Sequence, residues 1–263
     1  MTLIMGIVNV TPDSFSDGGR YLDPDVAIAH ARQLRAQGAD LLDVGGESTR
    51  PGAQRVAPRV EQQRVLPVVE MLASEGAFVS IDTMNASTAV AAVRAGARLV
   101  NDVSGGLADP EMLAAVAGTD AHIALGHWRG PSAEMYARAD YADVAGEVAD
   151  ELDERVAAAA AAGIDASRIV VDPGIGFGKR GAQNWQTLRA LPALAARGHR
   201  ILVGTSRKRF LAETIGDDTD LARRDLATAV TSALAAGAGA WAVRVHDVPT
   251  TRDALAVARA WES

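Results

Sequence analysis

The stretch FVSIDTMNASTAVAAVRAGARLVNDV, residues 78–103, contains the repeating unit of this chain. Its first residues, Phe78–Asp82, form a short, mostly apolar run that predicts a strand. A helix is predicted at Ala86–Ala95, Gly96 is expected to end it, and Leu99–Val103 predicts the next strand. The order strand, helix, strand indicates a β-α-β unit with parallel strands.

Similar apolar runs recur about every 30 residues along the whole chain. They lack strict alternation of polar and apolar residues, which indicates strands buried on both faces, as in a parallel sheet. The predicted strands are Leu3–Val10, Leu41–Gly45, Phe78–Asp82, Leu99–Val103, His122–His127, Ile169–Asp172, Ile201–Thr205 and Trp241–His246. The predicted helices are Asp25–Gln37, Val60–Ser74, Ala86–Ala95, Pro110–Ala117, Tyr141–Ala162, Gln183–Ala196, Leu221–Ala236 and Thr250–Trp261.

Eight strand-then-helix units with nothing left over predict an α/β fold, a closed (β/α)8 barrel. The chain of 263 residues has the usual length of such a barrel, and no linker divides it, so residues 1–263 are predicted to form one domain. Glycines that stop helices precede several strands: Gly38, Gly76, Gly96, Gly163 and Gly198. The loops after the first two strands, Thr11–Leu22 and Gly46–Pro58, are unusually long, and we expect them to be mobile and to cover a site.

Composition excludes several classes of protein. The chain has no cysteine, which excludes disulfides and thiolate chemistry and agrees with a cytoplasmic location. The net charge of −7 and the absence of a Lys/Arg run argue against nucleic acid as a partner. The short apolar start, Met1–Val10, does not resemble a secretory signal, and no stretch is apolar enough to suggest a membrane span.

Polar residues gather at the predicted carboxyl ends of the strands, where barrel enzymes place their active sites. They are Asn9, Glu47, Thr49, Arg50, Asp82, Asn101, Asp102, His127, Asp172, Ser206, Lys208, Arg244 and His246. For Glu47 and Asp102 a structural role in a helix cap or turn is equally acceptable, and His127 is as easily structural as part of a site. Asp43, within a strand, is expected to bond locally.

Arg244 and His246 are two residues apart on the last strand, so their side chains share a face. The loops after the seventh and eighth strands commonly bind phosphate in this fold, and Arg with His suits a phosphate oxygen. An internal salt bridge of Arg244 is the alternative.

Three other motifs predict little. Gly176, Gly178 and Gly181 match G-x-G-x-x-G but follow the sixth strand, and no acidic residue lies at the ribose-binding distance. Lys179 suggests a phosphate-binding loop, but Arg180 stands where Ser or Thr is required. The histidines show no zinc pattern, and no G-x-S-x-G motif indicates a serine hydrolase.

Seven motifs, in order along almost the whole chain, resemble the dihydropteroate synthase family of pterin-binding barrel enzymes. The two longest are MGIVNVTPDSFSDGG at residues 5–19 and DVGGESTRPG at residues 43–52. The others are SIDT at 80–83, NDVSGG at 101–106, DPGIGFGK at 172–179, SRKR at 206–209 and RVHD at 244–247. Where many members have Met before the histidine of the fifth strand, this chain has Gly126, which is expected to enlarge the pocket, with Trp128 compensating.

The resemblance implies that a dihydropterin pyrophosphate is joined through its methylene carbon to p-aminobenzoate with loss of pyrophosphate, so that these two small molecules are the substrates. It implies a pterin site of Asp82, Asn101, Asp172 and Lys208, of which Asp82, Asp172 and Lys208 would be catalytic. Pyrophosphate would be bound by Asn9, Arg244 and His246, with Asn9 also a ligand of Mg2+. The p-aminobenzoate site, where sulfonamides would compete, would comprise Thr49, Arg50, Pro51, Phe177, Ser206 and Lys208.

The resemblance also suggests a homodimer, with an interface on the late helices. Its candidate residues are Leu226, Val230, Leu234, Val257 and Trp261, for which packing against the barrel is the alternative. Two other functions are considered: a pterin-dependent methyltransferase, which would not need the two long loops, and a catalytically silent paralogue, which should have lost residues such as Lys208 or Arg244.

Overall fold

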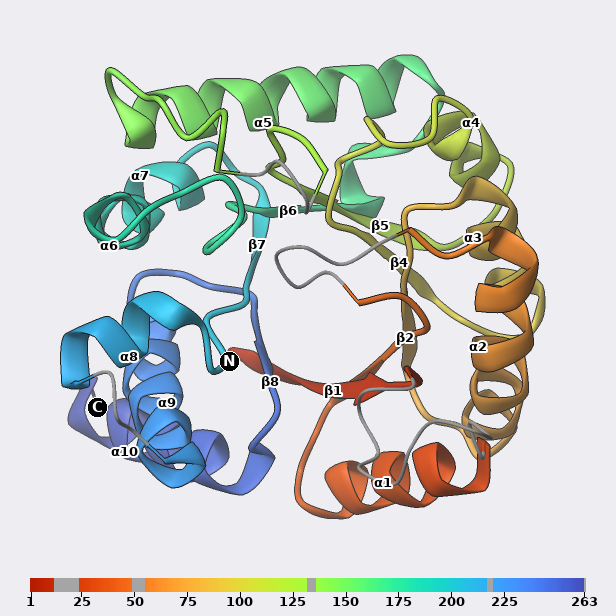
Figure 1. The fold of residues 1–263 in the computed structure, drawn as a ribbon, viewed down its shortest axis with the longest axis horizontal. Helices are drawn as coiled ribbons and strands as arrows, with labels where there is room; N and C mark the ends of the chain where they lie inside the picture. The colour runs from red at the N-terminus through yellow and green to blue at the C-terminus, as the bar shows by residue number, and fades with distance from the viewer. Residues whose placement is uncertain (12–23, 49–54, 132–135, 217–219, 263) are drawn as a thin grey trace.

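The eight strands close into one parallel barrel in the order β1 to β8, surrounded by helices (Figure 1). The computed structural model describes residues 1–11, 24–48, 55–131, 136–216 and 220–262. The strands are β1 (Leu3–Asn9), β2 (Leu41–Gly45), β3 (Val79–Asp82), β4 (Leu99–Asp102), β5 (His122–Gly126), β6 (Ile169–Asp172), β7 (Arg200–Val203) and β8 (Ala242–Val245). The predicted (β/α)8 barrel is therefore confirmed. That residues 1–263 form a single domain stays a prediction.

The helices of the described residues also follow the predicted order. They are α1 (Pro24–Ala36), α2 (Pro58–Ser74), α3 (Ala86–Arg94), α4 (Met112–Ala117), α5 (Val144–Ala161), α6 (Ala182–Arg189), α7 (Leu191–Ala195), α8 (Arg209–Ile215), α9 (Leu221–Gly237) and α10 (Val248–Glu262). Gly96 ends α3 with a φ of 108°, the left-handed conformation that glycine adopts at little cost.

The helices differ from the prediction in two places. The single helix expected at Gln183–Ala196 is divided into α6 and α7 at Ala190, because Pro192 has no N–H to continue the hydrogen-bond pattern. Helix α8 was not predicted: it is a short extra helix between β7 and α9 (Figure 1). Its position after β7 is typical of extra helices in this fold.

The apolar core has two parts. The larger part lies between the outer face of the strands and the helices and includes Val44, Ile81 and Val100. A smaller cluster fills the inside of the barrel. It consists of Met5, Leu41, Leu99, Ala124, Val170, Leu202 and Ala242. The barrel interior is thus packed with side chains, as this fold requires.

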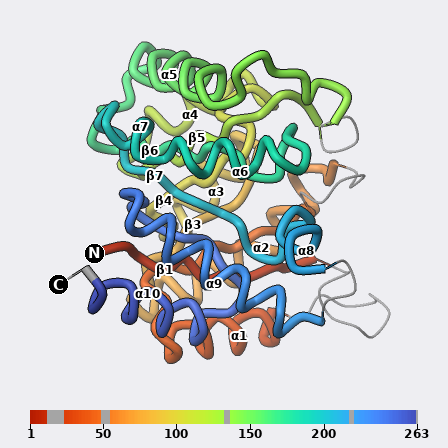
Figure 2. Tube along the Cα trace, turned by 90° about the vertical axis from the view of Figure 1, so that its left-hand side faces the viewer, coloured from red at the N-terminus to blue at the C-terminus, as the bar shows by residue number. Residues whose placement is uncertain are grey.

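No helix of the described residues is long and apolar enough to cross a membrane. That finding does not address the cytoplasmic location, which stays a prediction. Most of the first long loop, and residues 49–54 of the second, lie outside the described residues, so their expected mobility also stays a prediction. Figure 2 shows α9 and α10 side by side along one flank of the barrel, with the N-terminus close to α10.

Candidate active site

A pocket of about 1360 Å3 opens at the carboxyl ends of the strands. Every described residue of the predicted site lines it: Asn9, Asp82, Asn101, Asp172, Phe177, Ser206, Lys208, Arg244 and His246. The remaining three predicted residues, Thr49, Arg50 and Pro51, lie outside the described residues. The sequence therefore brings together side chains from six different strands or the loops that follow them.

The floor of the pocket is one layer above the apolar cluster inside the barrel. Side chains two residues apart on a strand point the same way. The layer is therefore formed by Asp43, Asn101, Asp172 and Arg244, which follow Leu41, Leu99, Val170 and Ala242 at a spacing of two residues. The barrel interior changes from apolar to charged over this single step.

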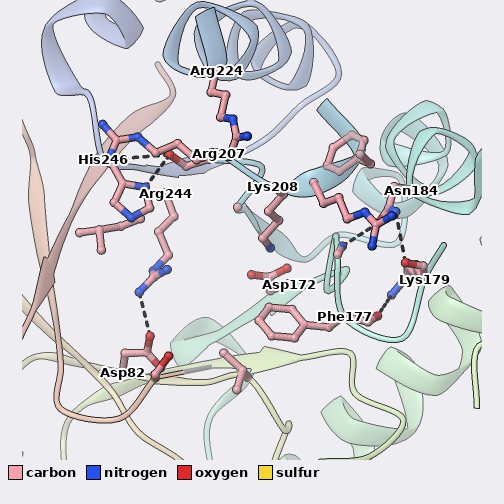
Figure 3. A pocket seen from close by; sticks show the side chains of 18 of the residues that line it. Asp82, Asp172, Phe177, Lys179, Asn184, Arg207, Lys208, Arg224, Arg244 and His246 are labelled. Atoms are coloured by element: carbon pink, nitrogen blue, oxygen red, sulfur yellow. Dashed lines mark hydrogen bonds and ion pairs between the residues drawn. The ribbon is translucent and has the colours of Figure 1, made fainter. Parts of the chain in front are cut away.

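Arg244 connects two buried carboxylates, Asp43 in this layer and Asp82 at the end of β3. Its Nε lies 2.6 Å from Oδ2 of Asp43, and its Nη2 lies 2.8 Å from Oδ2 of Asp82 (Figure 3). The amide of Asn101 donates to the same Asp43 oxygen at 3.0 Å. The local bonding expected of Asp43 was wrong, because its partners lie across the barrel. The internal salt bridge considered for Arg244 is present.

Burial sets the titration of these groups. It raises the pKa of Asp82, reinforced by Asp43 and opposed by Arg244, and it raises the pKa of Asp172 against the effect of Lys208. Burial lowers the pKa of Lys208 to about 8, although Asp172 opposes the shift. In the pocket, each carboxylate is therefore stabilised in its charged form by a neighbouring cation, and each cation by a carboxylate. Removing one partner would leave a buried charge unpaired, which is costly.

Lys208 extends from the start of α8 towards Asp172 and lies beside the ring of Phe177 (Figure 3). Its ammonium donates to the carbonyl oxygen of Ile175 and lies 4.6 Å from the centre of the Phe177 ring. This distance is typical of a cation–π contact. The lysine, the aromatic ring and the acid therefore form one wall of the pocket.

Ser206 and His246, predicted for different substrate groups, are direct neighbours. The hydroxyl of Ser206 lies 2.8 Å from Nδ1 of His246 and accepts from the backbone N–H of His246 at 3.1 Å. If the hydroxyl donates to Nδ1, the imidazole proton is on Nε2, where it can be donated to an anion.

Arg207, between Ser206 and Lys208, has a left-handed backbone with a φ of 58°. Its guanidinium forms two hydrogen bonds to Asp225 of α9, at 2.7 and 2.8 Å. Left-handed backbone is uncommon in residues other than glycine, and this ion pair helps to hold it. Arg207 thus lies in a strained backbone position between two lining residues, and its partner Asp225 lies on a different helix.

Asp102, Glu47 and His127, for which the sequence left a structural or a site role open, take different positions in the structure. Asp102 accepts hydrogen bonds from the backbone N–H groups of Ser104 and Gly106, at 2.8 and 2.7 Å, so it is structural. Glu47 lines the pocket and pairs with Arg55 at 3.0 Å. His127 is buried behind the wall and does not line the pocket.

Gly126 does not enlarge the pocket, so that expectation was wrong. A Cβ placed on Gly126 would lie 2.4 Å from the carbonyl oxygen of Val103, which occupies the space. Neither Gly126 nor Trp128 is part of the pocket lining in the described chain.

Sequence reasoning missed two pocket residues beside the glycine-rich segment. Lys179, dismissed as an incomplete phosphate-binding motif, lines the pocket and is 1% exposed. Asn184 of α6 also lines it and accepts from the backbone N–H of Gly176 at 2.6 Å. A lysine inside a glycine-rich turn after a strand end was the available signal.

The family model for pterin binding enzymes matches residues 5–246. A parallel barrel with this charged pocket is therefore an enzyme of the pterin-binding class. Dihydropteroate synthase of Mycobacterium leprae is 54% identical, covering 98% of this chain and 93% of the relative.

Two solved structures are also similar, both of Xanthomonas albilineans dihydropteroate synthase. The complex with 4-aminobenzoic acid has a TM-score of 0.92 at 45% identity and covers 100% of this chain and 93% of that one. The complex with 7,8-dihydropteroate has a TM-score of 0.89 at 42% identity, covering 100% and 94%. The chain belongs to the dihydropteroate synthase family.

Proposed function

We propose that this pocket joins (7,8-dihydropterin-6-yl)methyl diphosphate to p-aminobenzoate, giving 7,8-dihydropteroate and pyrophosphate. The observation that carries the proposal is the convergence of Asp82, Asn101, Asp172 and Lys208 with Arg244 and His246 in one pocket. These groups supply hydrogen-bond partners for a heterocycle and cations for a diphosphate at adjacent positions.

The pterin is assigned to the floor of the pocket. A pterin edge alternates donors and acceptors, and the carboxylates of Asp82 and Asp172 accept from N–H groups while Asn101 and Lys208 donate. The buried position of Asp82 and Asn101 supports this assignment, since they are only 7% and 3% exposed. Buried polar groups discriminate strongly against a ligand that leaves them unpaired.

The diphosphate is assigned to Asn9, Arg244 and His246, with Nε2 of His246 as a donor. Among the described residues, no group of three His, Asp or Glu side chains could hold a metal. Mg2+ nevertheless fits here, because it usually keeps several waters and is bound by few protein ligands together with substrate phosphates. The amide oxygen of Asn9, at the end of β1, is a ligand of the type that Mg2+ prefers. Bound Mg2+ would neutralise charge on the departing pyrophosphate.

The p-aminobenzoate is assigned to the wall formed by Phe177, Ser206 and Lys208, with Thr49, Arg50 and Pro51 of the second long loop. Phe177 offers an aromatic face at the pocket edge. The same assignment predicts that sulfonamides compete with p-aminobenzoate.

In the reaction, the bond between the pterin methylene carbon and the diphosphate oxygen breaks, and the electron pair leaves with pyrophosphate. Arg244 and His246 stabilise that charge. The carboxylates of Asp82 and Asp172 stabilise the positive charge that develops on the pterin ring. The amine nitrogen of p-aminobenzoate forms the new bond and then loses one proton. This amine is weakly basic and needs no strong general base.

The test is pyrophosphate release by purified protein with Mg2+ and dihydropterin diphosphate, with and without p-aminobenzoate. We expect release that depends on p-aminobenzoate and is lost in Asp82→Asn and Lys208→Ala. Pterin binding without release would indicate the silent paralogue and overturn the proposed activity. Methyl transfer from a methylated folate would indicate the methyltransferase.

We also propose that the chain is a homodimer through α9 and α10. The residues Leu226, Val230, Leu234, Val257 and Trp261 are 58%, 50%, 67%, 70% and 90% exposed. The alternative that they pack against the barrel is wrong, and exposed apolar side chains on two adjoining helices support an interaction site there. Analytical ultracentrifugation should give twice the mass of one chain for the wild-type protein. The Leu234→Glu variant should give the mass of a single chain.

A further inference from the structure

The chain contains only two lysines among its 26 lysine and arginine residues, and both line the pocket. Lys208 belongs to the proposed pterin site. Lys179 has no role in the reaction described above, although it is 1% exposed and is the largest fully buried side chain of the described residues. A buried ammonium is costly unless its donors are satisfied, so its partners define what it does.

Burial lowers the pKa of Lys179 to about 7, although Asp172 opposes the shift. In the ammonium form, all three donors of Lys179 are used. Nζ donates to the carbonyl oxygens of Gly174 at 3.0 Å and Phe177 at 3.2 Å, and it lies 2.9 Å from Nδ1 of His127. An ammonium has three N–H donors and no acceptor. Lys179 therefore has no donor left for a substrate, and two of its three contacts lie on the segment that carries Phe177 (Figure 3).

His127 is prepared as an acceptor. Its Nε2 lies 2.9 Å from Oε2 of Glu151, whose carboxylate is also held by Arg129. Because the Lys179 ammonium at Nδ1 can only donate, the imidazole proton lies on Nε2, on the side of the Glu151 carboxylate. Burial, with the charge of Lys179, lowers the pKa of His127 to about 4, so the ring is neutral.

The opposite side of the same segment is held by Lys208. Lys208 donates to the carbonyl oxygen of Ile175, which lies between the two carbonyls bound by Lys179. Gly176 packs so closely that a Cβ there would lie 2.8 Å from Cδ of Lys208. The two lysines therefore bind alternate backbone carbonyls of residues 174–177, and the position of Phe177 depends on both.

We propose that Lys179 is a positioning residue that fixes the Phe177 ring against Lys208 and so sets the affinity for p-aminobenzoate. The inference rests on the assignment of p-aminobenzoate to the Phe177 wall. It also explains why lysine occurs here in a chain that otherwise uses arginine. Three acceptors around one point suit a compact ammonium, whereas a planar guanidinium spreads its donors over a larger fork.

The first test is steady-state kinetics of Lys179→Met with both substrates varied. We expect the KM for p-aminobenzoate to rise at least about tenfold. The reason is that the Phe177 ring would move, and a small displacement of a group that contacts the substrate has a large effect. The KM for the pterin substrate should rise less than the KM for p-aminobenzoate, since Lys179 forms no hydrogen bond to Asp82, Asn101 or Asp172. Equal changes in both KM values, or an unchanged KM for p-aminobenzoate, would overturn the proposal.

A pair of variants at His127 tests the same contact without changing either lysine. Asn at position 127 can present an acceptor close to the position of Nδ1, whereas Leu cannot. We expect His127→Leu to raise the KM for p-aminobenzoate and His127→Asn to restore most of it. If Lys179→Met does not fold, the comparison of His127→Leu with His127→Asn tests the proposal in its place. Equal KM values for p-aminobenzoate in these two variants would overturn it.

The two lysines permit a direct readout that needs no activity. Protein labelled with 15N-lysine should give only two side-chain nitrogen signals. We expect the Lys179 signal to shift in His127→Leu and to return near its wild-type position in His127→Asn, with Lys208 as the internal reference. Wild-type protein without pyrophosphate release would overturn the proposed function alone. An unshifted Lys179 signal would overturn the lysine proposal.

Discussion

Two layers of side chains inside the barrel differ completely in chemistry, although a single step along each strand separates them. The lower layer, with Leu41, Leu99 and Val170, is apolar and fully or nearly fully buried. The upper layer contains charged or amide residues at the corresponding positions: Asp43, Asn101, Asp172 and Arg244. The same backbone geometry supports both.

The difference shows how the fold separates stability from chemistry. The lower layer closes the barrel by removing apolar surface from water. The upper layer is stable only because its charges are paired with one another, as Arg244 is with Asp43 and Asp82. We therefore expect substitutions in the lower layer to change stability and those in the upper layer to change activity. Arg244 is the exception that tests this separation.

Arg244→Met should have the largest combined effect. It removes the cation from two buried carboxylates and should lower the free energy of unfolding by about 3 kcal/mol. It should also remove most activity, since the diphosphate loses a partner. Denaturant unfolding and pyrophosphate release measure the two effects. Loss of activity at wild-type stability would mean that Asp43 and Asp82 do not depend on Arg244.

Lys208→Met should lower kcat/KM by about 10²- to 10³-fold, the usual effect of removing one positioned donor at a reacting centre. Lys208→Arg is the matched control, because it keeps the charge while changing the geometry. Stability should fall less than in Arg244→Met, because Lys208 is only half-buried, whereas Arg244 pairs with two buried carboxylates. Near-normal kcat/KM in Lys208→Met would remove Lys208 from the proposed site.

Leu99→Ala tests the lower layer. Leu99 is fully buried, and its truncation should lower the free energy of unfolding by about 2–5 kcal/mol through the cavity that it leaves. The kcat of the folded fraction should remain close to wild type, because Asn101, two residues later, keeps its place. A large fall in kcat at 25 °C would show that the two layers are not separable.

The pH dependence of kcat/KM at neutral pH should be small and should become evident only on the alkaline side. Burial lowers the pKa of Lys208 to about 8, so the ammonium loses its proton as the pH rises through this value. The reaction requires the charged form, and the rate should therefore fall about tenfold per pH unit above pH 8. In Lys208→Arg this fall should be absent, because arginine stays charged. A fall at the same pH in both proteins would assign the titration to another group.

The barrel and the polar residues at its strand ends could be predicted because each depends on local sequence, whereas Phe177 was expected only from the family resemblance. The period of apolar runs gives the strands, and the polar residue that follows each run gives the strand end. The partners within the pocket could not be predicted in the same way. Asp43 and Arg244 are 201 residues apart in the chain, and only closure of the barrel brings them together.

Two further features depend on tertiary contacts. The left-handed backbone of Arg207 is held by Asp225 on another helix, and no turn motif specifies it. Lys179 looked like part of a failed phosphate-binding motif because its partner, His127, comes from a different strand end. Sequence patterns thus identify the groups in the pocket, whereas burial and pairing decide their roles.

The most direct test of the account is the equilibrium dissociation constant of a dihydropterin ligand for wild type, Asp172→Asn and Asp165→Asn. The two acids flank β6: Asp172 lines the pocket, whereas Asp165 is exposed and caps a short 3-10 helix at the other end. We predict that Asp172→Asn weakens binding roughly 10- to 100-fold, as expected when a buried acceptor no longer matches its ligand. Asp165→Asn should bind like wild type. Wild-type affinity in Asp172→Asn would contradict the assignment of Asp172 to the pterin site.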